Sequence, residues 1–118
     1  MPTEAERANQ ATQNETFADC VCFVLKDHFA WAVTALFYSV VHLSRAFMSR
    51  HGAPAITSHK SFETEFLRFA RDRSLYKLYR RMKDESEAAR YDCRAYTVTD
   101  VQMLKKNVFE PCKAGFLK

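Results

Sequence analysis

Apolar residues recur at helical intervals along most of the chain. Near the start these residues are Phe17, Val21, Val24 and Leu25. The interval predicts a first helix from about residue 3 to residue 25, whose part before residue 17 is polar enough to fray. Thr3 and Glu6 have the spacing of a capping box, which places the beginning of this helix at Thr3.

The second predicted helix, from about Phe29 to Arg50, is the most apolar part of the chain, with apolar residues on nearly every side. Such a helix must be surrounded, so we expect it to be buried all round, at the centre of a bundle or also against a second subunit. Gly52 and Pro54 mark its end, because glycine suits a helix C-cap and proline cannot continue the helix.

Three further helices are predicted. Their apolar positions are Phe62, Phe66, Phe69 and Ala70 in the third, Leu75, Leu78, Tyr79, Met82, Ser86, Ala89 and Cys93 in the fourth, and Val101, Leu104, Val108, Cys112 and Phe116 in the fifth. Ser58 and Thr97 are capping residues for the third and fifth, and Pro111 predicts a kink or break in the fifth.

Length and composition agree with this helical pattern. With 118 residues, two glycines and three prolines, the chain suits a single all-α domain over residues 1–118 and lacks the turn residues of a β fold. Short connections favour antiparallel neighbours, so we expect an up-down bundle of four main helices plus a fifth.

Positive charge is concentrated between Arg68 and Arg94. This segment holds nine basic and five acidic residues, and the difference of four equals the net charge of the whole chain, +4. A polyanion would be attracted here. The alternative is a solvated helix face with pairs such as Arg80–Asp84 and Lys83–Glu87. The candidate contacts for phosphate are His59, Lys60, Arg68, Arg71, Arg80, Arg81 and Arg90, and Tyr76, Tyr91 and Tyr96 are candidates for base stacking.

The four cysteines predict neither a disulfide framework nor a metal site. Cys20 and Cys22 point about 200° apart on a helix, and Cys93 and Cys112 form no second matched pair. We therefore expect no metal and no cofactor. The N-terminus lacks the pattern of a signal peptide, and polar residues such as His42 interrupt the apolar stretch, so we expect a cytoplasmic protein without a membrane span.

Three pieces of sequence occur in a familiar order. They are Ala35-Leu36-Phe37-Tyr38-Ser39-Val40-Val41-His42-Leu43-Ser44-Arg45-Ala46, then Ser58-His59-Lys60 with Phe62 and Phe66, and then Tyr79 with Ser86-Glu87-Ala88-Ala89-Arg90-Tyr91. Together with Ala114 and Phe116 they resemble the higher eukaryotes and prokaryotes nucleotide-binding (HEPN) domain family, over about residues 17–117. Arg90 stands where that family usually has an aspartate before the tyrosine.

The resemblance implies a bundle of four or five helices, commonly a homodimer, in proteins associated with RNA cleavage, nucleotidyltransferase partners, toxin–antitoxin modules and phage defence. Ribonuclease members carry an arginine and a histidine separated by four to six residues. The match here is Arg45 and His51, with five residues between them. Arg45 would stabilise the scissile phosphate and His51 would act as general base. This pair straddles the end of the second helix, whereas the family motif lies later in the bundle.

Three functional hypotheses follow. The first is a dimeric HEPN-like module that binds RNA or a nucleotide without the usual catalytic motif, in a toxin–antitoxin or defence context, with a cognate nucleotidyltransferase or antitoxin protein as partner. The second is a metal-independent endoribonuclease, and the third is a structural adaptor for an acidic protein. The expected homodimer interface consists of Phe37, Tyr38, Val41 and His42.

Overall fold

The computed structural model describes residues 2–25, 28–52, 59–69 and 73–118, with side chains for all of these except 24, 25, 59–61, 68 and 69. All regular structure within these ranges is helical, which confirms the predicted all-α bundle. The α-helices are α1 (Glu4–Asp19), α2 (Phe29–Arg50), α3 (His59–Phe69), α4 (Arg73–Tyr91), α5 (Val98–Leu104) and α6 (Glu110–Leu117). Two π-helical segments, Cys20–Leu25 and Lys105–Phe109, follow α1 and join α5 to α6.

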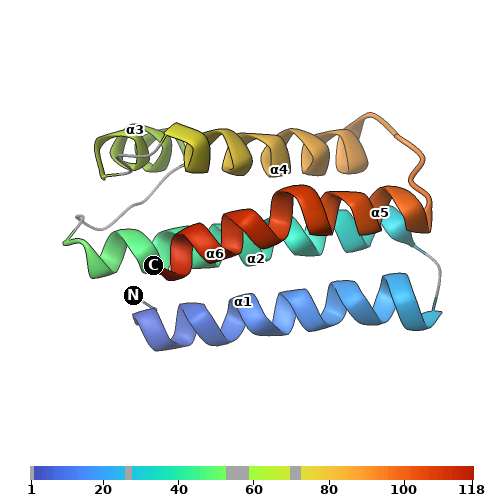
Figure 1. Ribbon diagram of the computed structural model, residues 1–118, viewed down its shortest axis with the longest axis horizontal. Helices are drawn as coiled ribbons and strands as arrows, with labels where there is room; N and C mark the ends of the chain where they lie inside the picture. The colour runs from blue at the N-terminus through green and yellow to red at the C-terminus, as the bar shows by residue number, and fades with distance from the viewer. Residues whose placement is uncertain (1, 26–27, 53–58, 70–72) are drawn as a thin grey trace.

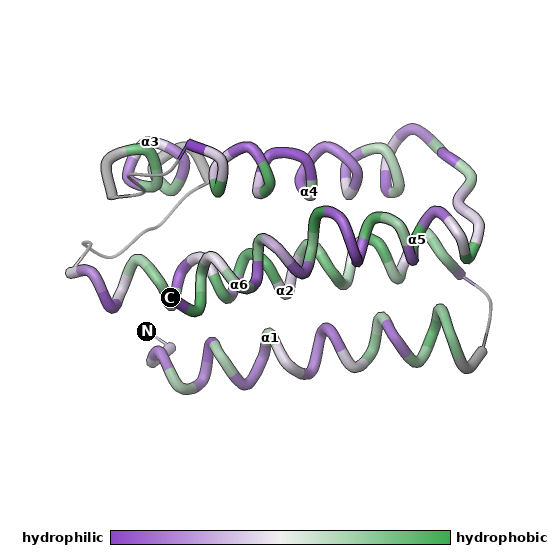
Figure 2. Tube along the Cα trace, viewed as in Figure 1, coloured by the Kyte–Doolittle hydropathy of each residue, from purple (hydrophilic) through white to green (hydrophobic). Residues whose placement is uncertain are grey.

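The central element is α2 (Figure 1). Helix α1 lies along one side of α2 and α4 along the other, while α5 and α6 run in front of α2. The short helix α3 lies beside the beginning of α4. Figure 2 shows hydrophobic residues along the length of α2 and many hydrophilic residues along α4. The apolar α2 is thus enclosed by amphipathic helices, which keep their polar sides in water.

An aromatic core joins α3, α4 and α6. Phe66 stacks on Tyr79 with ring centroids 5.6 Å apart and meets Phe116 edge-on at 5.5 Å. Phe62 adds a contact with Tyr79 at 5.2 Å. Each of these rings is almost completely buried, and burial of one such side chain contributes about 1.5–3 kcal/mol. Phe62, Phe66, Tyr79 and Phe116 all belong to the predicted apolar faces, which confirms those positions.

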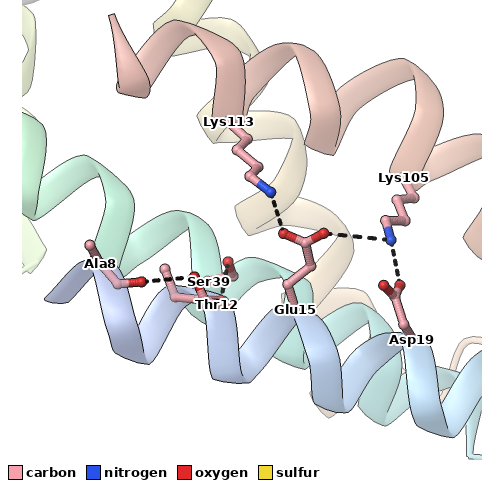
Figure 3. Close-up of polar contacts among 8 residues, drawn as sticks. Ala8, Thr12, Glu15, Asp19, Ser39, Lys105 and Lys113 are labelled. Atoms are coloured by element: carbon pink, nitrogen blue, oxygen red, sulfur yellow. Dashed lines mark hydrogen bonds and ion pairs between the residues drawn. The ribbon is translucent and has the colours of Figure 1, made fainter. Parts of the chain in front are cut away.

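Close packing and ion pairs hold α1 in place (Figure 3). The buried hydroxyl of Ser39 on α2 donates a hydrogen bond of 2.8 Å to the carbonyl oxygen of Ala11 on α1. On the side of α1 that faces the C-terminal segments, Lys113 Nζ lies 2.6 Å from Glu15 Oε1, and Lys105 is paired with Asp19. Helix α1 is therefore fixed both to α2 and to the C-terminal helical segments.

The predicted helix ends are largely confirmed. Both capping boxes are present, Thr3 with Glu6 before α1 and Thr97 with Asp100 before α5. Gly52 follows the end of α2 with φ of +78°, a conformation that glycine adopts without strain. Ser58 and Pro54 lie outside the described residues.

Pro111 interrupts the fifth predicted helix, as expected. Proline has no N–H to donate and its ring collides with the carbonyl of the residue four positions earlier in a regular α-helix. Here the π-helical segment Lys105–Phe109 widens the preceding turn, and α6 begins at Glu110, directly before the proline. All five apolar positions of this predicted helix are buried: Val101, Leu104, Val108, Cys112 and Phe116.

The first helix, α1, is regular from Glu4 to Asp19. Two details of the expected helices were wrong. Phe17, which we expected to be packed, is 54% exposed. Cys93 lies beyond the end of α4 as an exposed residue with φ of +53°, so it is not part of the packed face of that helix.

Candidate nucleic-acid interface

One face of α2 remains open. Of the sixteen residues from Trp31 to Ala46, eleven are buried, and the five that are not follow one another at steps of four, three, four and three: Trp31, Ala35, Tyr38, His42 and Arg45. Because an α-helix has 3.6 residues per turn, these five positions share one face, called here the open stripe. Within this chain α2 is therefore not buried all round, and the alternative that a second subunit covers the remaining face stays a prediction.

The open stripe faces away from α6. Phe47 packs against Phe116 of α6 with ring centroids 5.7 Å apart, and Phe47 is two residues, or about 200° of helical rotation, from Arg45. The helices beside the stripe are instead α1 and α4, which flank α2 (Figure 1). Each of them contributes an arginine to the stripe.

From α4, Arg90 lies against the aromatic end of the open stripe. Its Nη1 donates a hydrogen bond of 3.0 Å to the Tyr38 hydroxyl, and its Cζ is 5.7 Å from the Tyr38 ring centroid and 5.1 Å from that of Tyr91. Trp31 is 63% exposed and Tyr91 72% exposed. A pocket of about 340 Å³ lies between them, lined by Ala30, Trp31, Thr34, Ala89, Arg90 and Tyr91.

From α1, Arg7 reaches the other end of the open stripe. Its Nη1 lies 3.2 Å from His42 Nδ1. Because a guanidinium group only donates, the His42 Nδ1 is the acceptor and the proton of the neutral ring sits on Nε2. Burial, together with the charges of Arg7 and Arg45, lowers the pKa of His42 below its ordinary value of 6.5. The imidazole is therefore neutral at pH 7 and has an N–H to donate.

Arg45 completes this end of the stripe. Its side chain is half-buried, with Cζ 6.0 Å from the centroid of the Phe62 ring. Its Nε is fully buried and has no hydrogen-bond acceptor within the described part of the chain. Burial and the charge of Arg45 also lower the pKa of Arg7, which shows that the two cations act on each other.

The three arginines of this face have one property in common. None of the ion pairs found among the described side chains includes Arg7, Arg45 or Arg90. The positive charge of these three arginines is therefore not neutralised by a carboxylate that the structure describes. Together with Trp31, Tyr38 and Tyr91, these arginines make a surface that combines cations with planar rings.

Several of the basic residues predicted to bind phosphate are engaged elsewhere. Arg80 lies 2.9 Å from Glu63 and 3.5 Å from Asp84, and Arg81 lies 3.4 Å from Glu85. The i,i+4 pairs of a solvated helix face are thus present at these two positions. Lys83 pairs with Glu63 at 2.7 Å. Of the other candidates, Arg71 lies outside the described residues, as do the side chains of His59, Lys60 and Arg68.

The candidate catalytic pair is not brought together. The ring of His51 packs on Phe47 with centroids 4.4 Å apart, whereas the guanidinium of Arg45 lies over Phe62. Six residues along a helix correspond to about 9 Å of rise and about 240° of rotation, so the two side chains leave α2 in different directions.

The four residues expected at a dimer interface fall into two groups. Phe37 and Val41 are 2% and 6% exposed and belong to the core of this chain. Tyr38 and His42 lie on the open stripe. The homodimer itself stays a prediction, and only the second pair is available at the surface.

Sequence reasoning missed two members of this surface, Trp31 and Arg7. Trp31 sits on an apolar helix, where a hydrophobic residue is normally expected inside. Arg7 is 35 residues from His42 in the sequence, so its place depends on how α1 pairs with α2. A signal for the open face was present nevertheless, because Tyr38, His42 and Arg45 are the most polar large side chains in the middle of this helix and they share one side.

Two other kinds of site are absent from the described residues. No three or more histidine, cysteine, aspartate or glutamate side chains there are grouped so that they would hold a metal ion. No helix in the described ranges combines the length and apolarity needed to cross a bilayer. Comparisons with protein-family models, curated proteins and solved structures found no match.

Proposed function

We propose that this chain binds single-stranded RNA or a nucleotide along the open stripe of α2, without cleaving it. One observation carries the proposal: this face combines three arginines that form no described ion pair with three exposed aromatic rings, two of which, Tyr38 and Tyr91, contact Arg90. Single-stranded nucleic acids need both features, because phosphates are bound by cations and unstacked bases by flat rings. The HEPN resemblance supports the same ligand class.

The two ends of the stripe suit different parts of a strand. The pocket between Trp31 and Tyr91 is mostly apolar and open at the surface, so a base can stack there beside the Arg90 guanidinium. Stacking on an aromatic side chain contributes about 1–3 kcal/mol per base. Phosphates would follow the stripe from Arg90 toward Arg7 and Arg45.

The other expectations from the HEPN resemblance remain part of this proposal. They are a homodimer, a nucleotidyltransferase or antitoxin protein as partner, and a cytoplasmic defence role. Exposed Trp, Tyr and Arg are also the residues that contribute most to protein–protein interfaces, so a protein adaptor is the second candidate function. The ribonuclease hypothesis gains no support from Arg45 and His51, which face different neighbours.

Fluorescence anisotropy with a labelled ten-nucleotide single-stranded RNA tests the proposal. If the three arginines neutralise three phosphates, log K falls with log[salt] with a slope of about −2, a loss of roughly 20-fold between about 50 and 200 mM salt. Arg90→Ala should lower this slope to about −1.4 and weaken binding at every salt concentration.

Lys77→Ala is the matched control. It removes the same charge from the same helix, but Lys77 is exposed and lies about 140° round α4 from Arg90. We expect little change in affinity. Equal losses in the two variants would mean that net charge alone drives binding, and the absence of binding by the unaltered protein would favour the adaptor. Light scattering on the same samples decides whether the chain is a dimer.

A further inference from the structure

Arg7, His42 and Arg45 lie at one end of the open stripe. Their side chains supply hydrogen-bond donors, and no described ion pair neutralises the charge of the two arginines. Arg45 Nε is buried without an acceptor among the described atoms, and His42 carries its proton on Nε2 because Arg7 donates to Nδ1. Buried donors are normally paired, so a guanidinium nitrogen without an acceptor calls for an explanation, and an acceptor from outside the described residues would supply one. We call these three residues the Arg7–His42–Arg45 cluster.

One candidate for an internal counter-ion, Glu63, is already occupied. Glu63 and Arg45 both act on the Tyr79 hydroxyl, so this carboxylate is in the vicinity of the cluster. However, Glu63 accepts from Lys83 at 2.7 Å and from Arg80 at 2.9 Å, and these contacts lower its pKa. The charge of Glu63 is thus balanced by α4, so this carboxylate does not neutralise the two cations of the cluster.

The charge of the cluster indicates which anion fits. Arg7 and Arg45 carry two positive charges, while the neutral imidazole adds a donor without adding charge. An internal phosphodiester has one negative charge, whereas a phosphomonoester has about −1.5 to −2 at neutral pH and three acceptor oxygens. A phosphomonoester therefore matches both the charge and the number of donors.

We propose that the Arg7–His42–Arg45 cluster binds the terminal phosphomonoester of a strand whose bases stack near Trp31 and Tyr91. The inference rests on the proposed function and specifies its ligand as a strand with a phosphorylated end. His42 lies eleven residues from Trp31 along α2, which corresponds to about 16 Å of rise. At a stacked spacing of about 3.4 Å, roughly five nucleotides span this distance.

The test compares three five-nucleotide RNAs of one sequence, with a 5′-phosphate, a 3′-phosphate or two hydroxyl ends, by isothermal titration of the full chain. We expect one phosphorylated form to bind roughly tenfold more tightly than the hydroxyl form. The end that gives this advantage identifies the direction of the strand. Inorganic phosphate should compete more strongly with that form than with the hydroxyl form.

Arg7→Gln is the decisive variant, because glutamine keeps a hydrogen-bond donor at this position but carries no charge. It should reduce the advantage of the phosphorylated end to under about threefold, because it weakens binding of the phosphorylated form more than binding of the hydroxyl form. Lys77→Gln is the control and should retain the full advantage. Equal affinity for all three RNAs would overturn the terminal-phosphate site and leave the proposed function standing, whereas no binding of any RNA would overturn the proposed function as well.

Discussion

Replacement of Glu85 by alanine tests how the end of α4, which carries Arg90, is held in place. Glu85 is 8% exposed, and its carboxylate accepts a hydrogen bond of 2.9 Å from the Tyr96 hydroxyl and one of 3.1 Å from Arg94. Arg81 Nε lies 3.4 Å away. These contacts tie the connection between α4 and α5 to the last turns of α4.

The expected cost follows from these contacts. A hydrogen bond to a charged group contributes about 1.5–3 kcal/mol, whereas contacts with the two arginines count for less because their side chains are more than half exposed. The Tyr96 hydroxyl retains a second acceptor, the Glu85 carbonyl at 3.0 Å. We therefore expect Glu85→Ala to lower the free energy of unfolding by about 2 kcal/mol, or Tm by about 8 °C.

Thermal unfolding followed by circular dichroism at 222 nm measures this effect. Asp84→Asn is the matched control, because Asp84 is the neighbouring residue, is 59% exposed and makes only a surface pair with Arg80. Such a pair contributes under about 1 kcal/mol. If the two variants unfold within about 1 °C of each other, the Glu85 contacts do not hold this connection and the reasoning is refuted.

Three further results are expected. Burial and the hydrogen bond to Glu85 raise the pKa of Tyr96 to about 12, and burial raises that of Cys112 to about 12. The protonated Tyr96 and Cys112 side chains stabilise the fold fully below the pKa values of the unfolded chain, and this effect is lost as pH rises toward 12. The urea midpoint of unfolding should therefore fall steadily above about pH 9, and a constant midpoint up to about pH 11 would contradict this. The pKa of His42 is lowered by burial and by its two arginine neighbours. The neutral ring therefore contributes to the stability of the fold at pH values above the pKa of the unfolded chain, and this contribution is lost as pH falls through the folded pKa. NMR titration of the His42 ring should give a pKa below 6.5 that rises in Arg7→Gln, and a value unmoved by that change would remove Arg7 as a cause. Ser39→Ala removes the buried hydrogen bond to α1 and should lower the free energy of unfolding in urea by about 1 kcal/mol. An unchanged free energy of unfolding would contradict this.

Much of the fold follows from the periodicity of apolar residues. The described apolar positions of the later helices were predicted correctly apart from Cys93, because burial of a 3.6-residue pattern leaves few alternatives. The Phe69 side chain and Ala70 lie outside the described residues. The spacing of apolar residues also indicates the π-helical segment Lys105–Phe109. Leu104, Val108, Cys112 and Phe116 are spaced by four three times in succession, and each such step drifts by about 40° in a regular α-helix. A wider turn restores their alignment.

The candidate site was less predictable, because it depends on which side of α2 lacks a neighbour. Hydropathy alone makes Trp31 a core residue, and its exposure is decided by where α1 and α4 flank α2. Likewise, the basic segment of α4 is evident in the sequence, but the separation of Arg90 from Arg80 and Arg81 is not. That separation comes from Glu63 on α3 and from Asp84 and Glu85, which occupy the other two arginines.

The emission of Trp31 tests the central claim most directly, because it is the only tryptophan of the chain. Its intrinsic fluorescence is recorded while an unlabelled ten-nucleotide single-stranded RNA is added at about 50 mM salt and again at about 200 mM. We predict a saturable change in emission, with an affinity roughly 20-fold weaker at the higher salt concentration and a lower salt dependence in Arg90→Ala. Binding detected by anisotropy without any change in Trp31 emission would contradict the placement of the strand on the open stripe.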